Sequence, residues 1–279
     1  MLLEQRHPAR STARFSLRRL LWLILVLGIM LPAQRSFAGA RDTSIRVPIL
    51  VYHRFGPTVT DEMTVRTTTF KSQLDYLLSH GFHPVRLRDV VDDVLGHSSV
   101  PSGAFAITVD DGHRTVFSEM RPLIEKDRIP VTLFIYPSAI SNASYTMTWE
   151  QLKTLHDTGL FDIQSHTYWH PNFKRERKRL GPAEFLEMVN TQLSRSRTVL
   201  KSRLDLADVD MVAWPFGIYD AQLGEAARKL GYIAGFTIER RAAQPGDDTM
   251  ALPRFLVTDD LRGVAFERFM RQFAATPSR

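Results

Sequence analysis

Two short segments of the chain carry side chains suited to binding a metal ion and activating water. Asp110 and Asp111 follow the apolar run 104–109, and His166 and His170 follow the run 161–165. Carboxylate and neutral imidazole are ligands for zinc or a similar divalent cation, and such a set leaves positions open for water and substrate. Together the two segments predict a hydrolytic metal site.

Each segment taken alone has a second interpretation. Asp110 and Asp111 would point to opposite faces of an extended strand, but where the strand ends one can bind a cation while the other acts as a base. An Asp-Asp-Gly string is also typical of a plain turn. His166 and His170 would share one face on a helical turn. Because the chain has nine histidines, such a pair also arises by chance.

The elements that must position these residues alternate between strand-like and helix-like patterns. Expected strands cover residues 47–52, 82–85, 104–109, 131–136, 161–165, 211–214, 233–238 and 252–257; expected helices cover 69–78, 87–95, 116–126, 149–157, 182–204, 221–230 and a last segment from 264. This alternation predicts an α/β fold with a parallel sheet, either a barrel of about seven units or an open doubly wound sheet. Chemistry then collects at the carboxyl ends of the strands, where His53 and the 215–217 turn also lie.

The two segments match the motifs of a known family. Val109-Asp110-Asp111-Gly112 resembles the T-F-D-D-G motif of the polysaccharide deacetylases (NodB homology, carbohydrate esterase family 4), and residues 166–171 resemble their H-[ST]-x-x-H-P motif. The order of motifs is similar from residue 48 to 257. The resemblance implies a distorted (β/α)7 barrel in which Asp110 is the general base. It also implies that Asp111, His166 and His170 bind zinc, with cobalt or nickel as alternatives.

The third family motif, R-x-P-[YF]-G, is altered here. Residues 213–217 read Ala-Trp-Pro-Phe-Gly, so alanine stands where the family has the arginine that braces the base. The Phe216 N–H is still expected to donate to an oxyanion. Trp214 is the candidate to stack on a substrate sugar. Arg254 is the candidate to replace the missing arginine from another strand; the alternative is an ordinary surface ion pair.

The family's late L-x-H motif, which supplies the catalytic acid, is missing, because no histidine follows His170. The chain instead has Tyr52-His53 after its first expected strand. In this respect it is similar to the exported biofilm poly-N-acetylglucosamine deacetylases, and the resemblance implies that His53 is the acid. The alternative is a structural histidine at the barrel rim.

The resemblance implies an enzyme that hydrolyses linear amide C–N bonds, removing N-acetyl groups from an N-acetylglucosamine polysaccharide, with the biofilm β-1,6 polymer favoured. One alternative is a peptidoglycan or chitin-oligosaccharide deacetylase. Another is a catalytically degenerate barrel that binds polysaccharide, which the missing arginine and late histidine favour. The intact Asp-Asp and His-x-x-x-His strings favour an enzyme.

The first forty residues read as a targeting segment. Basic residues precede the apolar run 20–31, and Ala38-Gly39-Ala40 provides small residues for cleavage, which predicts a signal peptide; an uncleaved membrane anchor is the alternative. Residues 41–279 are then one deacetylase domain in the periplasm, outside the cell or on the envelope, with exopolysaccharide synthesis or export machinery as expected partners. Residues 1–40 hold six arginines and one glutamate, +5 of the chain's +6, so no nucleic-acid partner is predicted.

Overall fold

The apolar runs of the chain form one curved parallel sheet. The computed structural model describes residues 46–275, and the targeting segment predicted over residues 1–40 lies outside them. Seven strands follow the order β10-β1-β5-β6-β7-β8-β9, and the short β4 pairs with β5. The strands of this sheet are β1 (Ile49–Tyr52), β4 (His83–Pro84), β5 (Ala104–Asp110), β6 (Val131–Ile135), β7 (Phe161–Ser165), β8 (Met211–Ala213), β9 (Ala234–Phe236) and β10 (Phe255–Leu256).

Helices connect these strands. They are α1 (Thr67–Ser79), α2 (Leu87–Val94), α3 (Arg121–Asp127), α4 (Trp149–Asp157), α5 (Phe173–Arg179), α6 (Pro182–Leu204), α7 (Ala221–Lys229) and α8 (Val264–Met270). The helix expected over 116–126 begins as a π-helical turn, Val116–Met120, before α3. The sequence analysis did not anticipate α5 or the two-stranded sheet of β2 (Arg54–Gly56) and β3 (Thr64–Arg66). None of the helices in residues 46–275 is long and apolar enough to cross a bilayer.

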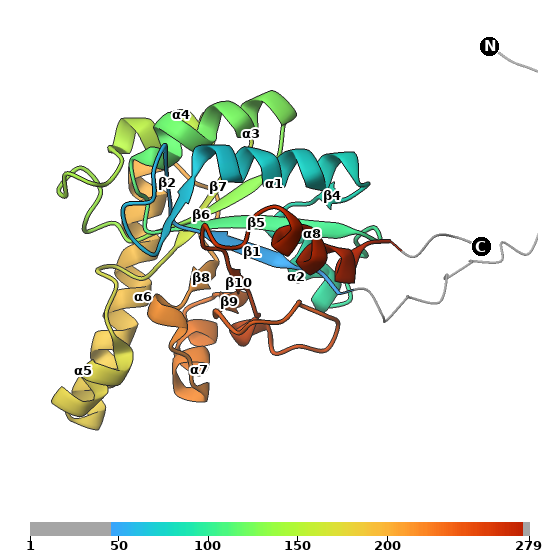
Figure 1. Ribbon diagram of the computed structural model, residues 1–279. Helices are drawn as coiled ribbons and strands as arrows, with labels where there is room; N and C mark the ends of the chain where they lie inside the picture. Colours follow the sequence, from blue (N-terminus) through green and yellow to red (C-terminus); the bar gives the residue numbers. More distant parts are fainter. Residues whose placement is uncertain (1–45, 276–279) are drawn as a thin grey trace, which may run out of the picture. The chain divides into compact units, whose positions relative to one another are not determined.

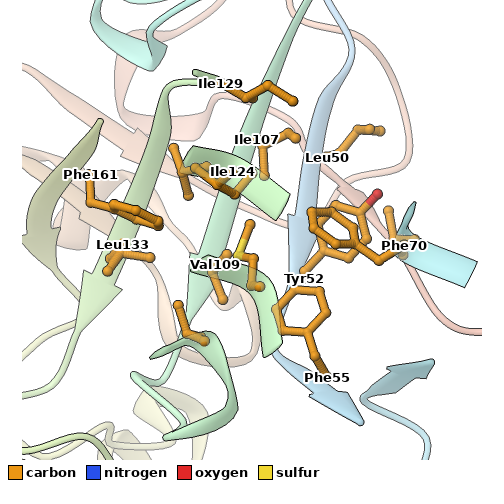
Figure 2. Packing of buried hydrophobic residues seen from close by; sticks show 14 of the residues in the cluster. Leu50, Tyr52, Phe55, Phe70, Ile107, Val109, Ile124, Ile129, Leu133 and Phe161 are labelled. Atoms are coloured by element: carbon orange, nitrogen blue, oxygen red, sulfur yellow. The ribbon is translucent and has the colours of Figure 1, made fainter. Parts of the chain in front are cut away.

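Alternate residues of the strands face two different cores. On β5, Phe105, Ile107 and Val109 pack into the larger cluster under the helices, whereas Ala104 and Ala106 join the cluster that includes α2. Figure 2 shows the larger cluster, in which side chains of β1, β5 and β6 meet Phe70 of α1 and Ile124 of α3. Figure 1 shows α1, α3 and α4 covering that side of the sheet. The same alternation sends Asp110 to the side of Ala104 and Ala106, into the barrel.

The last strands bring the chain back to its first strand. β10 pairs with β1, and the chain before it bonds to β9 through Leu252, whose N–H donates to the Gly235 carbonyl at 2.8 Å. The strands therefore curve into a partly closed barrel, which confirms the predicted distorted (β/α)7 barrel. Because all these pairings are parallel, the carboxyl ends of the strands meet at one rim.

Candidate active site

Asp110, the last residue of β5, is held by Arg254. Arg254 Nη1 donates to Asp110 Oδ1 at 2.8 Å, and Nη2 donates to Oδ2 at 2.7 Å. Its remaining hydrogen bonds go to Thr108 Oγ1 at 3.1 Å and to the Thr237 carbonyl at 3.0 Å. The Arg254 side chain is 0% exposed, so the alternative of a surface ion pair is wrong. The structure places Arg254 against the predicted base.

Arg254 also decides the charge of Asp110. Burial alone would raise the pKa of Asp110, but the positive charge of Arg254 and the hydrogen bonds from Arg254, together with the nearby His166, hold it far below the usual range. Asp110 is therefore an anion throughout the physiological range. Each of its oxygens accepts one N–H from Arg254 and keeps lone-pair capacity for a second partner. The carboxylate can still orient a water molecule or take its proton.

Asp111, His166 and His170 form a triangle beside Asp110. Asp111 Oδ1 lies 3.6 Å from His166 Nε2 and 3.7 Å from His170 Nε2, and one ligand atom from each residue fits within 4.8 Å. The chain turns sharply at Asp111, whose φ is 72°, so Asp110 and Asp111 leave the strand in different directions. The two carboxylates of the Asp-Asp string thus take different places in one site.

Both histidines of this triangle turn Nε2 toward Asp111. The His166 Nδ1 lies 2.8 Å from the Ala213 carbonyl, and because a carbonyl only accepts, Nδ1 carries a proton and leaves Nε2 as the ring atom that can bind a metal ion. Burial, with the neighbouring His166 adding to it, lowers the pKa of His170 to about 4 against the opposing effect of Asp111. Two imidazoles and one carboxylate fit a divalent cation such as zinc.

The two histidines do not converge through a helical turn, so that expectation is wrong. Residues 166–172 form an irregular loop in which Thr167 and His170 have φ of 64° and 59°. Positive φ is costly for a β-branched residue such as Thr167. Left-handed residues bend the loop so that the His166 and His170 rings meet edge to face, with centroids 4.6 Å apart.

His53, directly after β1, also faces the site. Burial lowers the pKa of His53, while the charges of Asp110 and Asp111 act in the opposite direction, which shows that the imidazole is close to both carboxylates. Its Nδ1 is buried and has no hydrogen-bond partner among the described residues. An unpaired buried ring nitrogen is costly, so a water molecule or a substrate group is expected to satisfy it.

The Pro215–Gly217 turn projects Phe216 over the triangle. Phe216 has φ of 58°, its ring is 57% exposed and lies 4.6 Å from the His170 ring, and its N–H has no partner in the described part of the chain. Gly217 allows this turn, because a Cβ there would lie 2.4 Å from Ile238 Cγ1. The free N–H is placed on the same side of the barrel as the histidines.

Trp214 is not at the surface, and the expectation that it stacks on a sugar is wrong. Its side chain is 0% exposed, and its Nε1 donates to the Met250 carbonyl at 2.8 Å. The ring packs edge to face against Phe173, with centroids 6.3 Å apart. Trp214 therefore packs in the core, where it contacts Phe173 and Met250, and does not contact a ligand.

Comparison with known proteins agrees with this geometry. Residues 97–235 match the family model described as polysaccharide deacetylase.

The chain belongs to the polysaccharide deacetylase family.

The most similar relatives and structures include enzymes of one kind. A poly-beta-1,6-N-acetyl-D-glucosamine N-deacetylase of Staphylococcus epidermidis is 26% identical over 219 residues, covering 75% of this chain and 72% of the relative. The enzyme of the same description from Staphylococcus aureus is 24% identical over 215 residues. The structure of IcaB from Ammonifex degensii superposes with a TM-score of 0.73 at 26% identity, covering 83% of this chain and 98% of IcaB.

A more distant structure shares the fold. The Streptococcus pyogenes deacetylase PplD, in complex with acetate, has a TM-score of 0.72 at 18% identity and covers 81% of this chain and 98% of its own. These findings confirm the family, the fold and the hydrolase class predicted from the sequence.

The deacetylase site contains two residues that the sequence analysis did not select. Tyr136 follows β6, and its ring centroid lies 5.4 Å from that of His170. Its hydroxyl lies 2.6 Å from that of Tyr145 in the same loop. Tyr136 ends the expected strand 131–136, and its place at a strand end was an available signal, because His53, Asp110 and His166 also lie at or just after strand ends.

Proposed function

We propose that this deacetylase removes N-acetyl groups from poly-β-1,6-N-acetylglucosamine, using zinc held by Asp111, His166 and His170. The observation that carries the proposal is the Arg254-clamped Asp110 carboxylate beside a triangle of one carboxylate and two imidazoles. The staphylococcal relatives and the IcaB structure support the β-1,6-linked polymer as the substrate.

A bound divalent cation would supply Lewis acidity toward the acetyl carbonyl and make water acidic enough to attack near neutral pH. The chain's own residues supply the proton transfers. Asp110, ionised and fixed by Arg254, accepts the proton that the attacking water loses. The fixed carboxylate does not need to reorganise before it acts, which is the benefit of a clamp with two parallel hydrogen bonds.

Two further groups act on the acetylated nitrogen and the carbonyl oxygen. The unpaired Phe216 N–H donates a hydrogen bond to the oxyanion that forms when water adds to the amide carbon. His53 donates a proton to the departing nitrogen, because an amine leaves readily only when it is protonated. Burial lowers the pKa of His53, and the charges of Asp110 and Asp111 in the resting site oppose that effect.

The proposal is tested by substrate comparison. Zinc-loaded protein is incubated with β-1,6-linked and with β-1,4-linked N-acetylglucosamine oligosaccharides, and released acetate and free amines are measured. We expect metal-dependent release with a preference for the β-1,6 series. A preference for the β-1,4 series would overturn the proposed linkage. No acetate from either series with zinc, cobalt or nickel would overturn the proposed activity.

We propose in addition that the domain works outside the cytoplasm, delivered by the targeting segment of residues 1–40. The apolar run 20–31 and the small residues 38–40 support export. Fractionation of cells that produce the full chain, with mass spectrometry of its N-terminus, should show exported protein that begins after residue 40. Intact protein in the cytoplasm would contradict this.

A further inference from the structure

Two aromatic rings, those of Phe216 and Tyr136, lie close to His170. The Phe216 ring lies 4.6 Å from the His170 ring, and the Tyr136 ring lies 5.4 Å from it at an interplanar angle of 43°. Tyr136 is also 6.5 Å from the ring of His166. The triangle of proposed metal ligands is thus bordered by Phe216 on β8's turn and by Tyr136 at the end of β6.

Tyr136 is joined to a second tyrosine and a histidine. The Tyr136 and Tyr145 hydroxyls are 2.6 Å apart, and the Tyr145 ring stacks on His113 with centroids 6.2 Å apart and planes 20° apart. We call Tyr136, Tyr145 and His113 the aromatic wall. His113 belongs to the loop after β5, so the wall draws on two neighbouring strand ends.

The backbone holds this wall in place. The Arg114 N–H donates to the Tyr145 carbonyl at 2.9 Å, and Arg114 Nη1 donates to the Ser144 carbonyl at 3.0 Å. His113 and Thr146 form an antiparallel bridge, and the Met147 N–H donates to the Gly112 carbonyl at 3.0 Å. These bonds fix the loop after β6 to the loop that carries Asp111. Tyr145 of the fixed loop is still 46% exposed and can contact a ligand.

The wall has surface and hydrogen-bonding capacity to spare. In a bond between two hydroxyls only one hydrogen is used, so one phenolic hydrogen of the Tyr136–Tyr145 pair remains free to donate. Beyond His113 the surface opens into a cavity of about 400 Å³ lined also by Arg54, Thr60 and Glu119. That volume is in the range of pockets that bind small ligands. Aromatic rings beside a reactive centre, with a neighbouring cavity that offers charged and hydroxyl side chains, suit a sugar, which has an apolar face and hydroxyls at its edge.

We propose that the aromatic wall of Tyr136, Tyr145 and His113 binds the sugar ring that carries the reacting N-acetyl group and orients it toward Asp110. The proposal rests on the proposed deacetylase function. It assigns the wall to the sugar and leaves bond cleavage to Asp110, His53 and the metal ligands. Loss of the wall should therefore weaken reactions of sugars selectively.

The test compares a sugar substrate with one that has no sugar. Zinc-loaded Tyr136→Phe, Tyr145→Phe and Tyr145→Ala proteins are assayed on a β-1,6-linked N-acetylglucosamine pentasaccharide and on 4-nitrophenyl acetate. Tyr76→Phe is the matched control, because Tyr76 packs on Phe266 and its hydroxyl makes only a 3.4 Å contact with the Glu267 carbonyl. Thermal unfolding and zinc binding are measured for each variant.

We expect Tyr145→Ala to lower kcat/KM on the pentasaccharide about tenfold, mainly by raising KM, because losing one hydrogen bond or one aromatic contact weakens binding by about tenfold. In the two phenylalanine variants, Tyr136→Phe and Tyr145→Phe, kcat/KM on the pentasaccharide should fall about threefold. Ester hydrolysis by all variants, and both activities of the Tyr76→Phe protein, should stay within about twofold of wild type. Unchanged kinetics of Tyr145→Ala on the pentasaccharide would overturn the proposal. Equal losses on both substrates would also overturn it, since they would show a structural effect on the metal site.

A binding measurement separates this proposal from the proposed function. Calorimetric titration of the pentasaccharide into Asp110→Asn protein should show binding that Tyr145→Ala weakens about tenfold in the same background. If Tyr145→Ala weakens pentasaccharide binding about tenfold but the wild-type protein releases no acetate, the proposed deacetylase activity is refuted and sugar binding by the aromatic wall is supported. If the wild-type protein is active but Asp110→Asn binds the pentasaccharide equally well with and without Tyr145→Ala, only the proposed role of the aromatic wall is refuted.

Discussion

Replacing Arg254 tests whether Asp110 works as a base only while both of its oxygens are clamped. In Arg254→Lys the positive charge stays, but an ammonium group cannot match the two parallel bonds of 2.8 and 2.7 Å. In Arg254→Gln the charge is lost as well. Both variants leave Asp111, His166 and His170 untouched, so any loss of activity can be compared with zinc binding.

The structure gives the expected sizes. Arg254 is fully buried and makes four hydrogen bonds, so Arg254→Gln leaves Asp110 buried and unpaired, which should cost about 3–5 kcal/mol of stability. At about 2–4 °C per kcal/mol for a domain of this size, the unfolding temperature should fall by roughly 6–20 °C. Arg254→Lys should be milder in stability but should lower kcat/KM about 100-fold, because misplacing a reacting group by about 1 Å has that effect.

The assay combines acetate release from the β-1,6 pentasaccharide with calorimetric unfolding and zinc titration. Arg88→Gln is a suitable control, because Arg88 makes a comparable two-bond pair with Asp210, at 3.1 and 2.6 Å, just before the start of β8. That pair lies at the amino ends of the strands and is partly exposed, so its loss should cost about 1 kcal/mol or less and leave kcat/KM unchanged. A folded, zinc-binding Arg254→Lys protein with kcat/KM within threefold of wild type would refute the reasoning.

Three further predictions concern the acid, the metal and stability. His53→Ala should lower pentasaccharide deacetylation about 10²–10⁴-fold with zinc binding intact, whereas exposed His80→Ala should change neither; near-normal turnover of His53→Ala would remove it as the acid. His170→Ala should weaken zinc binding by more than about 100-fold, measured by competition with a chelator, since losing an outer partner alone costs 10–100-fold; unchanged affinity would place the metal elsewhere. Burial would raise the pKa of Asp259, but hydrogen bonds from Arg66 outweigh it and hold that pKa far below the usual range, so Asp259 stabilises the fold above about pH 4 and this stability is lost as the pH falls below that value. Asp259→Asn should therefore unfold several degrees below wild type at pH 7, with the gap beginning to narrow as the pH falls below about 4; a gap independent of pH would contradict this.

Much of the fold followed from the sequence because its strands are buried on both faces. Continuous apolar runs such as 104–109 and 131–136 became β5 and β6 almost residue for residue. The segment α5 was missed, since its sequence is nearly all charged and only Phe173 and Glu176 are buried. The pair β2 and β3 was missed because three-residue strands carry too little pattern to separate from loops.

The site was predictable where residue type alone fixes the chemistry. Arg254 was selected because Ala213 stands where the family motif has its arginine and another strand end could supply one; the structure pairs Arg254 with Asp110. Trp214 was misplaced because an aromatic residue beside a motif is equally suited to the rim and to the core, and its burial depends on Phe173 and Met250, which are remote in sequence. The bond between Tyr136 and Tyr145 depends on how the loop after β6 bends, which local sequence does not specify.

The clamp on Asp110 has a consequence for when the protein becomes functional. Arg254 lies 144 residues after Asp110 and directly precedes β10, the strand that pairs with β1. Contacts of such long sequence separation form late, because the intervening chain must first be ordered. A chain that lacks Arg254 and its final strand, whether nascent or truncated, would hold both proposed metal-binding histidines but would leave the proposed base unfixed. The protein is therefore expected to become active only after the whole barrel has folded.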